Sequence, residues 1–153
     1  MEPLNQRTHT NVQARYPTMV VLWFGQLMSI GALFFFTLFL GPETCDKPGS
    51  SLLIVALTAV GTILVVVSFA VKRKFLERSV DRQQIDLVQK AFVIAGAMCE
   101  VSALLGLLER FVTGNRDYYL LFLIAAAGAA LHFPRREHLA AATYKASANE
   151  STF

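Results

Sequence analysis

One carboxylic acid, Glu100, lies close to the middle of an otherwise apolar run, VIAGAMCEVSALLGLL, residues 93–108. The nearest basic residues, Lys90 and Arg110, are each ten positions away, which is about 15 Å along a helix axis. A charged side chain at the midplane of a bilayer costs about 2.5 to 3.5 kcal/mol. If this run crosses a membrane, the acid must therefore stay protonated, because desolvation disfavours the charged form, or find a hydrogen-bonding partner.

Neutral polar residues are the available partners for this acid. Gln26 and Ser29 lie near the middle of the first apolar run of the chain, and Thr62 lies near the middle of the second. Bundled helices would place these three side chains in a supporting polar belt at the depth of Glu100. Gln26 can accept a hydrogen bond from a neutral carboxyl group or donate one to a carboxylate.

The positions one turn away from Glu100 are small: Gly96 and Ala97 before it and Ala103 after it. Small residues let a second helix approach closely, so the acid is expected on or beside a packing face. Two hypotheses follow. Either Glu100 binds and releases a proton or cation during transport, or a protonated Glu100 is an interhelical hydrogen-bonding residue worth about 1 kcal/mol. Gln26 and Thr62 on their own are typical packing residues.

The composition indicates which solvent surrounds these residues. Apolar residues make up 54% of the 153-residue chain and charged residues only 16%, which is too apolar for a small soluble domain. Continuous apolar runs of about 20 residues are typical of membrane-spanning helices. We predict an all-α integral membrane protein with four transmembrane helices arranged as two antiparallel hairpins. The predicted spans are 19–40, 52–71, 91–108 and 118–133.

Local signals set the expected ends of these spans. Pro17 and Thr18 suit the start of the first helix, because proline lacks an amide hydrogen that the first turn leaves unpaired, and Pro134 should end or kink the fourth. We therefore expect a cytoplasmic N-terminal tail (1–17), a transmembrane domain (18–133) and a cytoplasmic C-terminal tail (134–153). The tail sequence REHLAAATYKA permits a short surface helix.

The distribution of basic residues predicts the orientation. Eleven of the fourteen Lys and Arg residues lie in the two tails and the middle connection: Arg7, Arg15, Lys72, Arg73, Lys74, Arg78, Arg82, Lys90, Arg135, Arg136 and Lys145. Basic residues favour the cytoplasmic side. Both termini and the middle connection are therefore expected in the cytoplasm, and the protein in the cell (inner) membrane.

The third apolar run and the connection before it resemble a known family. AGAMCEVSALLGLL looks like the ion-carrying helix of the c subunit (proteolipid) of rotary ATP synthases, and ERSVDRQQIDLVQKAF resembles the polar connection of that family. The resemblance covers residues 75–112. It implies that Glu100 is the proton-carrying carboxylate and that Arg82 and Gln83 are polar-loop residues, with Gln84 in place of the family's proline.

Other chemistries find less support. His9, His132 and His138 show no metal spacing, and no Ser-His-Asp set or phosphate loop is visible. We expect no enzyme activity, no cofactor and no bound metal, and no nucleic acid, because the basic residues cluster beside apolar segments. Cys45 and Cys99 show no ligand spacing and no disulfide framework.

The sequence thus predicts a proton-translocating proteolipid-like subunit or carrier. The alternative is a non-catalytic accessory or structural membrane protein, and a small multidrug exchanger is a minor alternative. The expected partners are the lipid bilayer and other membrane helices in a homo- or hetero-oligomer. The KRKFLER segment can also attract anionic lipid headgroups.

Overall fold

The chain is helical throughout the residues that the structure describes. The computed structural model describes residues 4–41, 50–82 and 84–141. Its elements are α1 (Leu4–Leu40), α2 (Ser51–Arg82), α3 (Ile85–Thr113), the 3-10 helix η1 (Arg116–Tyr118), α4 (Tyr119–Leu131) and α5 (Arg136–Ala141). No strand occurs in this part of the chain, so the prediction of an all-α protein is confirmed.

Three helices are long and apolar enough to cross a membrane. They are the apolar parts of α1, α2 and α3, over Arg15–Leu40, Ser51–Arg82 and Asp86–Thr113. The fourth predicted span, 118–133, contains α4, whose 13 residues give a helix of about 20 Å. By itself α4 is shorter than the hydrocarbon core of a bilayer, which is about 30 Å thick.

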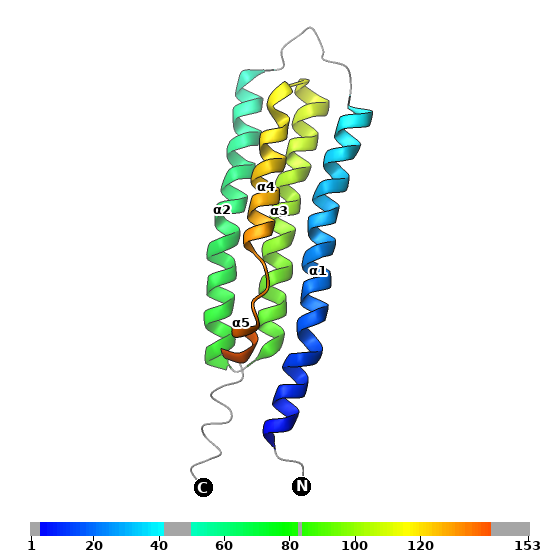
Figure 1. Ribbon diagram of the computed structural model, residues 1–153. Coiled ribbons are helices and arrows are strands. Elements are labelled where there is room, and N and C mark those ends of the chain that lie inside the picture. Colours follow the sequence, from blue (N-terminus) through cyan, green and yellow to red (C-terminus); the bar gives the residue numbers. More distant parts are fainter. Residues whose placement is uncertain (1–3, 42–49, 83, 142–153) are drawn as a thin grey trace.

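The four longer helices lie side by side, with α3 at the centre of the packing (Figure 1). α3 packs against α1, α2 and α4, while α1 packs against α3, α4 and α5. Among the described residues, α1 and α2 do not form an extensive pair, so the predicted hairpin of the first two spans is not confirmed. Instead α2 and α3, which are consecutive, form the most extensive helix pair. The start of α1, the turn between α2 and α3, and α5 lie at the same end of the bundle.

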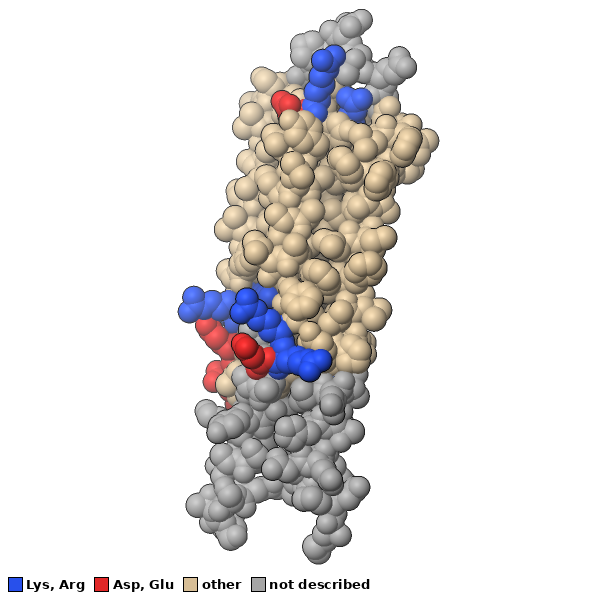
Figure 2. Space-filling view, in the orientation of Figure 1, with Lys and Arg blue, Asp and Glu red and all other residues tan. Residues whose placement is uncertain are grey.

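An apolar belt covers the middle of the bundle on the face that Figure 2 shows. No charged residue separates Ser51 from Lys72 on α2. On α3, Glu100 is the single charged residue between Lys90 and Glu109, an interval of about 28 Å at 1.5 Å per residue. Large apolar side chains remain exposed in this belt, among them Phe24, Met28, Phe35, Phe39, Val55, Ile63 and Val66. Such a surface fits a bilayer as its solvent.

The interior of the belt is built from small residues. Ala95, Cys99, Ala103, Ala125 and Ala129 are all at most 2% exposed. Gly128 on α4 shows why, because a Cβ at this position would lie 2.6 Å from Val65 Cγ1 and 3.1 Å from Cys99 Sγ. Only glycine lets α4 sit this close to α2 and α3.

The first helix begins earlier than we predicted. α1 starts at Leu4 and continues through Pro17, so proline does not mark its start. The lower turns of α1 contact other elements: Arg15 forms an ion pair with Asp86 of α3, and the Arg136 guanidinium lies 4.7 Å from the centre of the Tyr16 ring. These contacts hold the helix together across the position where proline removes a hydrogen bond.

Most of the connection between the second and third predicted spans is helical, although a polar loop was expected there. α2 continues to Arg82 and α3 begins at Ile85, so the two charged segments extend the helices beyond the belt. Lys, Arg, Glu and Gln are good helix formers, and the Arg73 Nε donates to Glu77 Oε1 one turn later at 3.0 Å. The expected polar loop is reduced to a short turn.

The fourth helix ends where the sequence indicates. α4 stops at Leu131, three residues before Pro134. The chain then passes through His132 and Pro134, both buried, and enters α5, whose Leu139 is 1% exposed. The tail sequence was expected to permit a short surface helix. The structure has a short helix there, α5 over Arg136–Ala141, and Leu139 packs it against the bundle.

Candidate functional site

Glu100 lies at the border between the exposed and the buried sides of α3. Val93 and Leu104, which are two turns before it and one turn after it, are exposed. Gly96 and Ala103, one turn away on the other side, are buried. Because residues at these spacings share one side of a helix, Glu100 stands at the edge of the lipid-facing strip, and its side chain is partly exposed.

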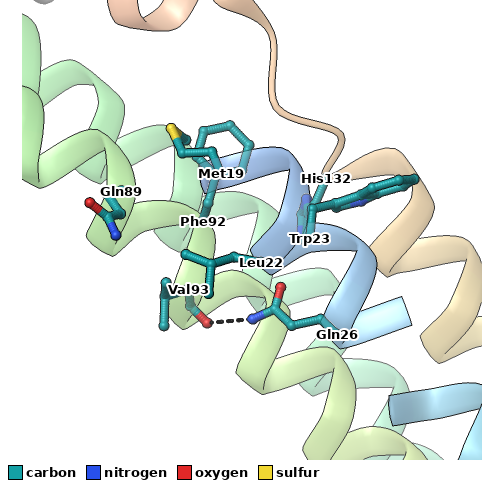
Figure 3. A pocket seen from close by; sticks show the side chains of 8 residues that line it. All are labelled: Met19, Leu22, Trp23, Gln26, Gln89, Phe92, Val93 and His132. Carbon is teal, nitrogen blue, oxygen red and sulfur yellow. Dashed lines mark hydrogen bonds between the residues drawn. The ribbon is translucent and has the colours of Figure 1, made fainter. Parts of the chain in front are cut away.

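The buried side of this border is the seam between α1 and α3. The Gln26 side chain packs directly on Gly96, so closely that a Cβ there would overlap its amide group. The Gln26 Nε2 donates to the Val93 carbonyl oxygen at 3.3 Å (Figure 3). Glu100 lies one turn after Gly96 on α3. Among the described residues, no hydrogen bond or ion pair joins Glu100 to another side chain.

The predicted polar belt is only partly gathered at this seam. α1 and α3 run in the same direction (Figure 1), so Ser29, one turn beyond Gln26, is at a height similar to that of Glu100. Thr62 belongs to α2, which packs on the opposite side of α3, where Gly61 meets Ser102. The Thr62 hydroxyl donates to the Thr58 carbonyl oxygen on its own helix at 2.8 Å.

Polar side chains approach the seam from the end that carries most basic residues. A cavity of about 10 Å³, enough for a single water molecule at most, lies between Gln26, Trp23, Gln89 and His132 (Figure 3). A larger groove of about 390 Å³ opens beside it, and its lining includes Asp86, Gln89, Lys90 and Val93. Polar groups thus reach from this end of the bundle to Gln26, just below Gly96.

The opposite half of the seam contains mainly apolar side chains, and its buried Thr37 hydroxyl donates to the Leu33 carbonyl oxygen within α1. Leu33 of α1 is partly buried and Leu104 of α3 is exposed. Further along, the rings of Phe36 and Phe111 stack with their centres 6.3 Å apart. The cavity and the groove lined by polar groups thus lie on the other side of Glu100, toward the end that carries most basic residues.

The two polar-loop residues stand at the turn between α2 and α3. Arg82 is exposed and is the last residue of α2. Gln83 lies outside the described residues. Gln84, in the position of the family's proline, is the residue before α3, and its extended backbone (φ −115°, ψ 105°) starts the new helix.

A second polar cluster inside the belt escaped the sequence analysis. Ser68 Oγ lies 2.8 Å from His132 Nε2 and 3.9 Å from Cys99 Sγ, and all three residues are buried. The Ser68 hydroxyl also donates to the Val65 carbonyl oxygen at 2.6 Å. A hydroxyl has one hydrogen, so Ser68 accepts from His132 and is not an activated nucleophile. The cluster joins α2, α3 and the end of α4.

Glu109 is a second acid that the sequence did not mark. It is 2% exposed, and its Oε1 accepts from Asn115 Nδ2 at 2.5 Å while its Oε2 accepts from Thr58 Oγ1 at 3.4 Å. These bonds tie the end of α3 to the following turn and to α2. Glu109 therefore has the partners that Glu100 lacks, which fits a structural role.

The chain matches no protein-family model, no curated protein and no solved structure. The resemblance to proteolipid subunits therefore depends on residues 75–112 alone. In the described part of the chain, no group of three or more His, Cys, Asp or Glu side chains is placed to hold a metal ion.

Proposed function

We propose that the protein is a multi-pass subunit or carrier of the cell membrane that works through reversible protonation of Glu100. The observation that carries this proposal is the position of Glu100, which is the single charged side chain across the apolar belt of the described helices. It lies at the α1–α3 seam, with Gln89 and Gln26 leading toward it from one end. Within the described residues, no hydrogen bond or ion pair gives this acid a structural partner.

The proposal includes a fourth span. α4 supplies about 20 Å, and residues 132–134 continue beyond it without regular helix (Figure 1), adding at most about 10 Å. Together they reach at most the roughly 30 Å of a hydrocarbon core. Non-helical backbone is tolerated at this depth where protein buries it, and His132 and Pro134 are buried.

In the proposal, one copy of the chain has one proton-binding residue, Glu100. Gln89 and Gln26 lie on the side from which a proton would approach it. In the other half of the seam the Phe36 and Phe111 rings stack, and the buried Thr37 hydroxyl donates to the Leu33 carbonyl oxygen of its own helix. A translocating assembly would therefore need a neighbouring helix to reach Glu100 from the exposed strip beside it.

A hydrophobic carbodiimide tests the proposal, because it modifies protonated carboxyl groups that it reaches from lipid. In membranes holding the full-length protein, Glu100 should be labelled, at a rate that falls as the pH rises. Glu100→Gln should abolish the labelled peptide, while the matched control Glu109→Gln should leave it unchanged. Folded protein without label on Glu100 at any pH would contradict the proposal.

The alternative function is that of a non-catalytic accessory or structural protein. It is favoured by the absence of any hydrogen bond to Glu100 within the described residues, which leaves the carboxyl group free for a donor on another chain. Under this alternative, Glu100→Gln should preserve a detergent-stable oligomer or co-purifying partner and Glu100→Leu should release it. Loss of proton-coupled activity in Glu100→Gln, with the assembly intact, would favour the carrier instead.

A further inference from the structure

A groove at the edge of the apolar belt combines basic and apolar walls. It has a volume of about 500 Å³ and lies between α2 and the segment that leaves α4. Its lining residues are Phe69, Lys72, Arg73, Leu76, Glu77, Val80, Leu131, Phe133 and Arg135. Figure 2 shows Lys and Arg side chains gathered along the lower edge of the belt, over the lower part of α2.

The groove lies at the depth where a bilayer changes from hydrocarbon to headgroups. Lys72 is the first charged residue of α2 after the apolar span, and Arg135 is the first charged residue after α4. Leu131 and Phe133 extend from the groove toward the belt and are 70% and 43% exposed. A ligand here would therefore meet cations at one end and apolar side chains at the other.

The groove is lined by three basic side chains and one acidic side chain. Arg73 pairs with Glu77 at 3.0 Å. Within the described residues, neither Lys72 nor Arg135 forms an ion pair with a carboxylate. Lys72 instead lies over the Phe92 ring, with Nζ 4.4 Å from its centre. Two cations without counterions at a membrane interface favour an anion from the lipid phase.

We propose that this groove binds an anionic glycerophospholipid. Its phosphate lies among Lys72, Arg73 and Arg135, and an acyl chain lies against Leu131 and Phe133. The predicted cytoplasmic orientation of this end agrees, because anionic lipids of the cytoplasmic leaflet attract basic residues beside membrane helices, at about 1 kcal/mol for each Lys or Arg.

Lipid binding to the full-length protein in detergent tests this proposal by native mass spectrometry. Phosphatidylglycerol should bind with at least tenfold higher affinity than phosphatidylcholine, and inorganic phosphate should compete poorly. The double variant Lys72→Gln/Arg135→Gln should weaken phosphatidylglycerol binding about thirtyfold, the ratio that corresponds to about 2 kcal/mol. The matched control Lys74→Gln/Arg78→Gln removes the same charge from α2 outside the groove and should change binding less than threefold.

Three results would overturn the proposal. Equal weakening in the two double variants would mean that surface charge alone attracts the lipid. If phosphatidylcholine bound as tightly as phosphatidylglycerol, the groove would bind lipids through apolar contacts alone. Full competition by inorganic phosphate would make it a site for free phosphate. The comparison of lipids on the unaltered chain needs no variant, so a variant that fails to fold does not prevent the test.

Discussion

At the scale of single residues, the contact between Gln26 and Gly96 positions the proposed proton site. Gln26 reaches across the α1–α3 seam, occupies the space against Gly96 and donates to the Val93 carbonyl oxygen at 3.3 Å. Glu100 follows one turn later. The geometry of this pair thus determines how closely α1 approaches the helix that carries the acid.

Gly96→Ala tests this contact. The added methyl group would overlap the Gln26 amide, and overpacking of this kind costs roughly 1–3 kcal/mol. The thermal unfolding temperature in detergent should therefore fall. Gln26→Ala in the same chain should recover most of the loss, because it vacates the space.

Gly25→Ala is the matched control for this prediction. A Cβ at Gly25 has no other group within 4 Å, and alanine is the better helix former by about 1 kcal/mol. This variant should be neutral or slightly more stable. Equal losses for Gly25→Ala and Gly96→Ala would show that the seam is not tightly packed.

At the scale of the helices, the turn after α3 fixes how α3 and α4 are joined. Gly114 adopts φ 64° and donates from its backbone to the Arg110 carbonyl oxygen, which is a common helix ending. Asn115 then bonds the buried Glu109. A single left-handed residue and one buried acid thus reverse the chain.

Gly114→Ala should destabilise the protein by about 1 kcal/mol, since other L-amino acids adopt the left-handed conformation at a cost of about 1–2 kcal/mol. Gly114→Asn should cost less, because asparagine tolerates this region better. Thermal unfolding of the two variants measures the difference. If alanine and asparagine were equally tolerated, the strained turn would not contribute to stability.

The helices show clearly what the sequence can predict. Continuous apolar runs predicted the positions of the spans in α1, α2 and α3. Pro134 predicted that α4 ends shortly before that residue. The extension of α1 through Pro17 could not be predicted, because it depends on contacts with Asp86 of α3 and with Arg136, the first residue of α5. Local signals describe one helix at a time and carry no information about such neighbours.

The same limit applies to the site. The free-energy cost of a carboxylic acid in the hydrocarbon core of a bilayer singles out Glu100 from the sequence alone. In the structure, Gln26 lies on the same α1–α3 seam. The assignment of Thr62 to the same belt was made from depth only, and depth does not tell which side of α3 faces α2. Ser68 and His132 are 64 positions apart, so their hydrogen bond has no signature in the sequence.

At the scale of the whole molecule, the orientation in the membrane decides which side supplies the proton. Most basic residues lie at the end that contains the start of α1, the α2–α3 turn and α5. The positive-inside rule predicts that this end is cytoplasmic. The polar approach to Glu100 would then open from the cytoplasm.

The two cysteines report this orientation. Cys45 lies in the segment between α1 and α2, outside the described residues, and is predicted to face away from the cytoplasm. Cys99 is buried. A membrane-impermeant maleimide applied to intact cells should therefore label the protein, and Cys45→Ser should abolish the label. Labelling that appears only after the cytoplasmic face is exposed would reverse the orientation.

The most direct test of the account is infrared difference spectroscopy of the protein in lipid membranes during a pH titration, comparing the unaltered chain with Glu100→Gln. We predict that the unaltered chain shows the C=O stretch of a protonated carboxylic acid, that this band disappears reversibly as the pH is raised, and that Glu100→Gln lacks it. A band that stays the same at every pH, or one that persists in Glu100→Gln, would contradict reversible protonation of Glu100.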